Sequence, residues 1–288
     1  MTTNIPPQQA DDALSPETIT STTSSAATTA SATTDTNTCT DATVLPDATA
    51  TSADNSSASE AGEHPHQRIR SFVIRAGRMT NAQTKALEEL GPKYVLDVSA
   101  LQPLDVAAAF GREAPVVVEI GFGMGKSFIE MAQHDPLRNY LGIEVHPPGI
   151  GATLLLIEEL GLTNVRLIKH DAFEVLTQCL GPESIDILQI FFPDPWPKAR
   201  HHKRRLVNPE FLALVTPLLK HGGEIRMATD WQEYAEQMLE CLNNAPELSN
   251  TNPEGGYIPR PEWRPLTKFE KRGERLGHGV WDLVFKRD

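Results

Sequence analysis

The residues with the clearest potential for chemistry form a glycine-rich turn, Gly121, Gly123 and Gly125, which directly follows the apolar run VVVEI. A phosphate-binding loop of the form G-x-x-x-x-G-K-[ST] fits only in its last three residues, because Ile120 stands where the first glycine belongs. A dinucleotide fingerprint needs G-x-G-x-x-G, and the spacing here is G-x-G-x-G. Either a different cofactor or a glycine turn without a ligand would explain this spacing.

Three carboxylates accompany the turn. Glu119 precedes it, Glu144 ends the next expected strand and Asp171 ends the third. Converging acids repel a polyphosphate, whereas they attract a cationic ligand rich in hydroxyl groups. S-adenosyl-L-methionine is such a ligand, with positive amino and sulfonium groups, a ribose diol and an adenine amine. We expect Glu144 to accept from the ribose and Asp171 from the adenine amine, with the glycines allowing close backbone approach. A half-buried, structural Glu119 is the alternative.

A stiff, proline-rich loop, FFPDPWPKARHHKRR at residues 191–205, follows the fourth expected strand. It contains one acid, Asp194, and one indole, Trp196, between prolines that restrict the backbone. A planar base could lie against this loop while Asp194 accepts from a ring N–H and an exocyclic amine. Guanine offers that pair of donors on its Watson–Crick edge.

The same loop continues into a dense basic run. Its cations are Lys198, Arg200, Lys203, Arg204 and Arg205. Such a cluster, on a chain that is otherwise nearly neutral outside its first 66 residues, is typical of contact with a nucleic-acid backbone. A solvated loop is the alternative interpretation.

These residues need a scaffold that brings strand ends together. Apolar runs at 116–121, 139–145, 164–171, 184–192 and 222–230 predict strands, and runs at 126–134, 151–161, 172–180 and 208–220 predict helices. Their alternation predicts an α/β fold with a mostly parallel sheet covered by helices on both faces. The alternating run 281–287 predicts an antiparallel edge strand. Ligands of such sheets lie outside the carboxyl ends of the strands, where the residues above are placed.

The first 66 residues differ from the rest. They contain no Lys or Arg, and nine of the chain's 38 acidic residues, so they carry most of its formal charge of −12. Their Thr, Ser, Ala and Asp predict a disordered acidic tail, and residues 67–288 predict one domain. Repulsion between the tail and RNA, discouraging non-specific binding, is a second possible role.

Other features exclude several classes of protein. No apolar run approaches the roughly 20 residues of a membrane span. The three cysteines, Cys39, Cys179 and Cys241, lie too far apart for a C-x-x-C metal site. We therefore expect a cytoplasmic monomer without metal or membrane contact.

Six motifs in order, EIGFGMGKS, GIEVH, HDA, FFPDPWPKARHHKRR, MATDW and TKFEKRGERLGH, resemble the bacterial tRNA (guanine-N7-)-methyltransferase family over about residues 67–288. The resemblance implies a Rossmann-like, S-adenosylmethionine-dependent enzyme that methylates guanine 46 in the variable loop of tRNA. It implies cofactor contacts at Glu119, Glu144, Asp171 and Asp194, the last also being the active-site acid. It implies tRNA contacts along Arg200 to Arg205 and substrate contacts at Lys198, Asp230, Thr267, Lys268, Phe269 and Glu270.

Two departures and two rival functions accompany this resemblance. Pro197 stands where members often have His, and the acidic tail is longer than is usual in the family. A small-molecule methyltransferase would share the turn and the acids but would not need the basic run. A non-catalytic RNA-binding protein would bind tRNA without the cofactor.

Overall fold

The computed structural model describes residues 69–73, 77–267, 270 and 279–288. The chain divides into two units, Met1–Glu63 and His64–Asp288, and the described residues all belong to the second. The predictions for residues 1–66, and for Lys268 and Phe269, lie outside the described residues.

The described residues form a seven-stranded sheet with the order β3-β2-β1-β4-β5-β7-β6. Its strands are β1 (Val116–Ile120), β2 (Asn139–Ile143), β3 (Val165–Ile168), β4 (Ile185–Phe191), β5 (Leu219–Thr229), β6 (Leu248–Asn250) and β7 (Trp281–Arg287). Strands β1 to β5 pair in parallel, and β7 is antiparallel to both β5 and β6. The predicted α/β fold with an antiparallel edge is thus confirmed. The short β6, which the sequence did not predict, forms the outermost strand beside β7.

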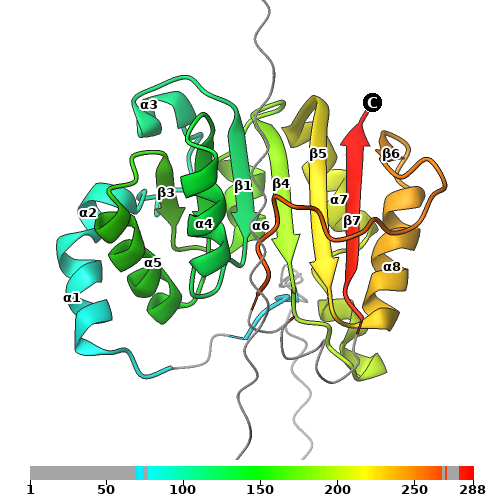
Figure 1. Cartoon of the computed structure of the whole chain (residues 1–288), viewed down its shortest axis with the longest axis horizontal. Helices are drawn as coiled ribbons and strands as arrows, with labels where there is room; N and C mark the ends of the chain where they lie inside the picture. The colour runs from blue at the N-terminus through cyan, green and yellow to red at the C-terminus, as the bar shows by residue number, and fades with distance from the viewer. Residues whose placement is uncertain (1–68, 74–76, 268–269, 271–278) are drawn as a thin grey trace, which may run out of the picture. The chain divides into compact units, whose positions relative to one another are not determined.

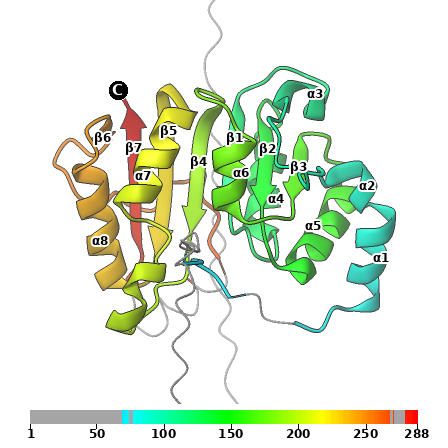
Figure 2. The ribbon, with the colours of Figure 1, turned by 180° about the vertical axis from the view of Figure 1, so that it is seen from behind.

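Helices cover both faces of this sheet (Figures 1 and 2). One face carries α1 (Asn81–Glu89), α2 (Gly91–Tyr94), α4 (Lys126–His134) and α5 (Pro147–Leu160), and the other carries α6 (Ala172–Gln178), α7 (Pro209–Val215) and α8 (Gln232–Asn243). The remaining helix, α3 (Val106–Phe110), precedes β1. Because strand side chains alternate, β1 supplies both cores: Val117 packs with Phe128 of α4, and Val118 with the cluster that includes Val175 of α6.

Local signals explain where several helices begin and end. Asn208 caps α7 by accepting from the amide of Phe211, as its position before a proline predicts. The helix is shorter than expected: it becomes a 3-10 turn at Thr216–Leu218, which contains Pro217, and β5 begins at Leu219. Proline has no N–H to continue the helical hydrogen bonds, which accounts for the early end.

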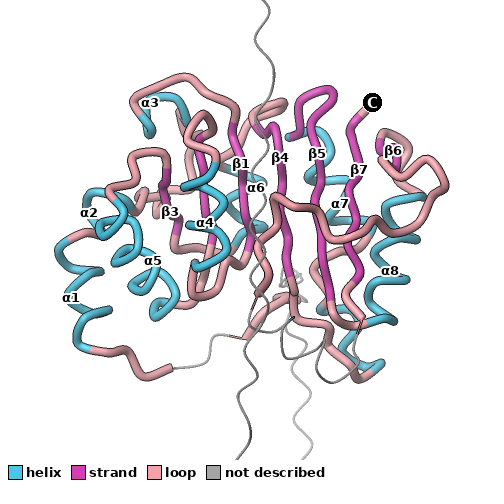
Figure 3. The backbone as a smooth tube through the Cα atoms, in the orientation of Figure 1, coloured by secondary structure: helices cyan, strands magenta, loops and turns pink. Residues whose placement is uncertain are grey.

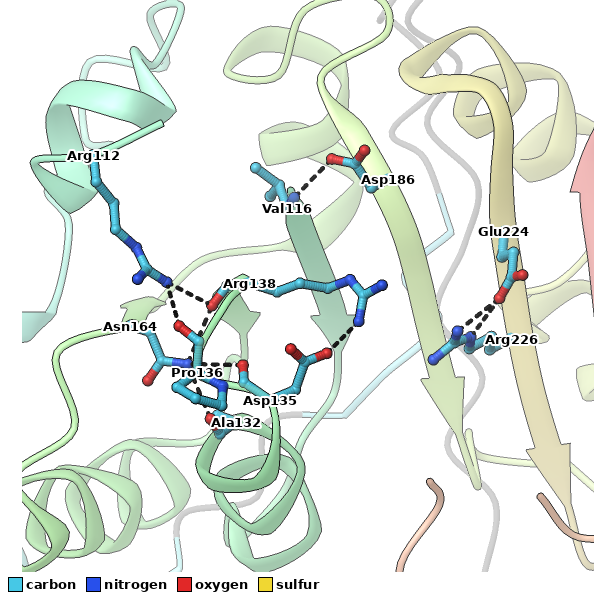
Figure 4. A network of polar contacts seen from close by, with 10 residues as sticks. All are labelled: Arg112, Val116, Ala132, Asp135, Pro136, Arg138, Asn164, Asp186, Glu224 and Arg226. Carbon is cyan, nitrogen blue, oxygen red and sulfur yellow. Dashed lines mark hydrogen bonds and ion pairs between the residues drawn. The ribbon is translucent and has the colours of Figure 1, made fainter. Parts of the chain in front are cut away.

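Polar contacts join the elements at the amino ends of the strands (Figure 4). Asn164, just before β3, donates to the carbonyl of Ala132 at 2.9 Å, and Asp186 of β4 accepts from the amide of Val116 at 2.7 Å. Arg112 donates to two backbone carbonyls, each at 2.9 Å. The opposite, carboxyl edge of the sheet is built mainly of loops (Figure 3), and it contains the candidate site.

Candidate active site at the carboxyl edge of the sheet

A cavity of about 240 Å³ opens where β1, β2 and β4 end. Gly121, Glu144, Asp171 and Asp194 all line it. These residues come from four separate motifs, so the fold unites the predicted glycine turn, two of the predicted cofactor carboxylates and the predicted active-site acid. Sequence reasoning did not anticipate that Phe72 and its neighbour Ser71 would also line the cavity.

The glycine turn depends on left-handed backbone and on a close helix. Gly121, Gly123 and Gly125 have φ values of 73°, 58° and 76°, which favour glycine. A Cβ at Gly125 would lie 2.0 Å from Oγ1 of Thr153, and a Cβ at Gly149 would lie 2.2 Å from the carbonyl oxygen of Gly123. Helix α5 therefore packs directly against the turn. No sequence motif pointed to Gly149.

Glu144 is held firmly by backbone amides. Its Oε2 accepts from Gly123 at 2.9 Å, and its Oε1 accepts from Val145 and His146 at 2.7 and 3.0 Å. A carboxylate offers about four lone-pair directions, so an acceptor site remains for a ligand hydroxyl in the cavity. The carboxylate thus both fixes the glycine turn and faces the site.

Asp171 occupies the start of α6. Its Oδ1 accepts from the amide of Phe173 at 3.0 Å, which caps the helix. This cap orients the carboxylate at the end of β3, beside the cavity that it lines.

Glu119 lies on the other face of the sheet. It neighbours Ile120 along β1, and since strand side chains alternate, Ile120 reaches the cavity while Glu119 does not line it. Glu119 is 4% exposed, and its Oε2 has no hydrogen-bond partner among the described residues. Burial, together with the nearby Glu144, raises its pKa to about 8. Glu119 therefore lies near Glu144 but does not line the cavity, and its contact with the cofactor stays a prediction.

The loop after β4 presents Asp194 to solvent and to the cavity. Phe192 and Trp196 on either side have φ values of 53° and 45°, a conformation that costs side-chain-bearing residues free energy. The loop is tied down by its indole, since Nε1 of Trp196 donates to the carbonyl of Ser71 at 3.0 Å. The segment containing Ser71 thereby becomes part of the site.

The basic run forms a 3-10 helix at Ala199–Arg204. Lys198, Arg200 and Lys203 are exposed, and Arg204 lies over the Trp196 ring with its guanidinium carbon 4.8 Å from the centroid. These four cations lie in and directly before one short turn that follows the Asp194 loop, and such a cluster of positive charge attracts a nucleic-acid backbone.

Arg205 differs from the other cations of the run. It is 2% exposed, and its guanidinium donates to the carbonyl of Pro195 at 2.8 Å and to Gln237 and Glu233 of α8 at 2.6 and 3.2 Å. A charge enclosed by these partners cannot reach a phosphate without breaking them. The expected tRNA contact at Arg205 is therefore corrected to a structural role, in which Arg205 anchors the proline-rich loop to α8.

The remaining predicted substrate residues lie at two places. Asp230 is exposed directly after β5. Thr267 and Glu270 bind each other reciprocally: the Thr267 amide donates to Oε2 of Glu270 at 2.8 Å, and the Glu270 amide donates to Oγ1 of Thr267 at 3.2 Å. Glu270 is 2% exposed and pairs with Arg264 at 2.7 Å, a partner that sequence reasoning missed.

Comparison with known proteins decides between the families that this geometry would allow. Residues 113–283 match the family described as "Putative methyltransferase". The tRNA (guanine-N(7)-)-methyltransferase of Paraburkholderia xenovorans (strain LB400) is 56% identical over 242 residues, which cover 83% of this chain and 92% of that protein. The protein of the same name from Aeromonas hydrophila subsp. hydrophila is 58% identical over 221 residues, covering 77% of this chain and 93% of that protein. The chain belongs to the tRNA (guanine-N7-)-methyltransferase family.

Solved structures resemble this family member more distantly. The 16S rRNA methyltransferase KamB is 15% identical with a TM-score of 0.45, covering 77% of this chain and 99% of that one. A likeness at this level adds nothing to the assignment.

The cavity fits the methyl donor S-adenosyl-L-methionine, in agreement with membership of a methyltransferase family. A glycine turn with open space at Gly121 and Gly123 adjoins two carboxylates, Glu144 and Asp171, and no Lys or Arg side chain lines the cavity in the described part of the chain. Carboxylate acceptors without a neighbouring Lys or Arg suit a positively charged cofactor with a ribose diol and an adenine amine.

Within the residues that the structure describes, no cluster of His, Cys, Asp or Glu is arranged to hold a metal ion. No described helix has the length and apolar character needed to cross a bilayer.

Proposed function

We propose that the protein transfers a methyl group from S-adenosyl-L-methionine to N7 of guanine 46 in the variable loop of tRNA, which forms 7-methylguanosine. The single observation that carries this proposal is the cavity in which Asp194 meets Glu144 and Asp171, beside an exposed basic turn. Membership of the family supports the same activity.

On the cofactor side, the protein's task is to bind and orient. Glu144 accepts from the ribose hydroxyls while backbone amides hold its carboxylate in place. Asp171, fixed by the α6 cap, accepts from the adenine amine. The turn at Gly121 and Gly123 gives the methionine moiety access to the backbone. When bound, S-adenosyl-L-methionine supplies an electrophilic methyl group on a sulfonium.

On the guanine side, no base is required. N7 carries an in-plane lone pair and no proton, so positioning and electrostatics are what the protein can contribute. Asp194 is exposed and lines the cavity, and its carboxylate forms no hydrogen bond or ion pair within the described residues, which leaves it available for the donors of the base. Asp194 orients the guanine and stabilises the cationic product rather than removing a proton.

The tRNA backbone is bound by the exposed cations Lys198, Arg200 and Lys203, with Arg204. Asp230 and the segment Thr267, Lys268, Phe269 and Glu270 contact the substrate around the base.

The catalytic unit is residues 67–288, acting as a cytoplasmic monomer, and residues 1–66 are a dispensable acidic extension. Removal of residues 1–66 should leave kcat unchanged. A gain in inhibition by bulk RNA after this truncation would instead assign the tail a role in selectivity.

The deciding experiment uses methyl-labelled S-adenosyl-L-methionine and two unmodified transcripts of one tRNA, with the variable-loop guanine either present or replaced by adenine. We expect labelled 7-methylguanosine only from the first transcript. Free guanosine, the matched small-molecule substrate, should accept far less label. Label at another guanine would overturn the position, and equal transfer to guanosine would overturn the tRNA specificity.

A further inference from the structure

The segment between β6 and β7 runs across one face of the sheet, in front of β7, β5 and β4 (Figure 1). Ile258 forms a bridge with Asp282 of β7, and the Trp263 ring lies 4.1 Å from the guanidinium carbon of Arg226 on β5. The same ring lies 6.2 Å from the ring of Phe191 at the end of β4. The segment is therefore fixed across three strands directly beside the loop that presents the catalytic carboxylate.

Arg264, the next residue after Trp263, is buried within this crossing. It is 1% exposed, and its Nε and Nη2 donate to the two oxygens of Asp282 at 2.6 and 2.8 Å. Its Nη2 also pairs with Oε1 of Glu270 at 2.7 Å. The planar fork of an arginine suits such a two-point contact, which the single ammonium of a lysine cannot reproduce.

Arg264 connects two parts of the substrate site. Through Glu270 it holds the reciprocal pair that Glu270 makes with Thr267. Its guanidinium carbon also lies 5.5 Å from the ring centroid of Phe192, the left-handed residue that begins the Asp194 loop. One rigid side chain thus contacts both Glu270 and the base of the Asp194 loop.

Stability alone is a weak reason for this arrangement. A buried ion cluster is often no more stabilising than apolar residues of the same volume. Nη1 of Arg264 is also buried without a hydrogen-bond partner among the described residues, and an unpaired buried donor carries a cost. A role in the geometry of the site explains this buried arginine better than a contribution to stability does.

We propose that Arg264 is a positioning residue for methyl transfer, which sets the reciprocal pair of Thr267 and Glu270 and the Asp194 loop at a fixed separation around the target base. The inference rests on the proposed function, because it assigns both parts to the same guanine. Arg264 itself needs no contact with the cofactor, since Glu144 and Asp171 are held by other elements.

The test is Arg264→Lys, which keeps the charge but loses the fork. Its matched control is Arg166→Lys on β3, where another partly buried arginine donates from its guanidinium to the carbonyls of Ala109, Thr163 and Val165. The measurements are total methyl transfer to an unmodified tRNA transcript, binding of S-adenosylhomocysteine by calorimetry, and thermal unfolding.

We expect Arg264→Lys to lower kcat at saturating tRNA about a hundredfold, because a displacement of about 1 Å at a reacting centre costs that much. Affinity for S-adenosylhomocysteine should stay within about twofold of wild type. Arg166→Lys should keep kcat within about twofold of wild type, even if its melting temperature falls as much as that of Arg264→Lys. Equal losses of kcat in the two variants would overturn the proposal.

A second measurement separates positioning from general damage. If Arg264 acts through the placement of Asp194, adding Arg264→Lys to Asp194→Asn should lower kcat much less than it does in the wild type. Independent, multiplying losses would overturn the proposal. If Arg264→Lys fails to fold, Phe192→Leu tests the same contact from the loop side, and an unchanged kcat there counts against it. Because total transfer is measured, methylation at a guanine other than 46 would refute the proposed position without affecting this test.

Discussion

The polar side chains at the two edges of the sheet differ in how many of their hydrogen-bonding atoms have partners. At the amino edge, Asn164 and Asp186 bind partners from neighbouring elements, and these contacts connect the strand starts (Figure 4). At the carboxyl edge, buried atoms without a hydrogen-bond partner among the described residues include Oε2 of Glu119, Oε1 of Gln189 and Nη1 of Arg264. Within the described residues the amino edge has no buried side-chain atom of this kind, whereas at the carboxyl edge part of the hydrogen-bonding capacity is left open.

Strand β4 contains this contrast within one element and its loop. Asp186, near its start, accepts from the amide of Val116 at 2.7 Å and from Nζ of Lys220 at 2.8 Å. Asp194, just past its end, is exposed and lines the cavity. Two aspartates eight positions apart thus serve the fold and the site respectively. The difference comes from the strand direction, since parallel strands place all their carboxyl ends at one edge.

The largest expected effect tests this pair directly. Asp194→Asn should lower kcat about a hundredfold through loss of a positioning charge, with no change in melting temperature. The remaining activity should not vary with pH, since N7 has no proton to remove. Kinetics from pH 5.5 to 9 would check both points, and a residual rate that follows a carboxylate titration would indicate base catalysis instead.

Asp186→Asn is the matched control at the amino edge. It should lower the free energy of unfolding by about 1 kcal/mol, or roughly 2–4 °C in melting temperature, because one charged acceptor is lost. Its kcat at 20 °C should remain that of the wild type. A large loss of kcat in this variant would contradict the separation of the two edges.

The next largest effects separate buried from exposed charge within the basic run. Arg200→Ala should raise the KM for tRNA several-fold and reduce the dependence of log K on log salt by about one, as removal of one phosphate contact does. Arg205→Ala should instead cost about 2 kcal/mol of stability, because Gln237 and the carbonyl of Pro195 lose a buried partner. Its salt dependence at permissive temperature should match the wild type. A changed salt dependence in Arg205→Ala, together with a loss of stability in Arg200→Ala, would refute the division into a structural Arg205 and a tRNA-binding Arg200.

Much of the fold could be predicted from sequence because its signals are local. The apolar runs ending in Ile120 and Phe191 predict strands, and Asn208 before a proline predicts the start of α7. Sheet topology then places the residues at strand ends together, which is why the sequence alone predicts Glu144, Asp171 and Asp194 as one site.

What could not be predicted depends on tertiary packing. Arg205 and Arg204 are adjacent and identical in type, yet only Arg205 is enclosed by α8, which begins 27 positions later. Phe72 reaches the cavity from a segment with no motif, and Arg264 is paired with a strand from the end of the chain. Glu119 is adjacent to the turn in sequence, but the alternation of β1 directs its side chain away from that of Ile120, so that it does not line the cavity; its cofactor contact stays a prediction.

The smallest expected effect concerns Glu119, a buried acid at the carboxyl edge that should lower the stability of the protein. The pKa of Glu119 is raised from 4.5 to about 8 by burial and by Glu144, so the folded protein holds a proton that the unfolded chain releases above pH 4.5. Stability should therefore fall as pH rises from about 4.5 to 8, by up to roughly 1.4 kcal/mol per pH unit, and this contribution should level off above 8.

Glu119→Gln removes the titration while keeping the shape of the protonated side chain. Urea unfolding at pH 5, 6, 7 and 8 should show the variant close to the wild type at pH 5 and increasingly more stable toward pH 8. Parallel curves would mean that Glu119 is ionised in the folded protein and paired with a group not seen here, and the cost would then lie elsewhere. Divergence of the curves would show that the protein holds a buried acid at the expense of its own stability, and a reduced affinity of the variant for S-adenosylhomocysteine would support the predicted cofactor contact at Glu119.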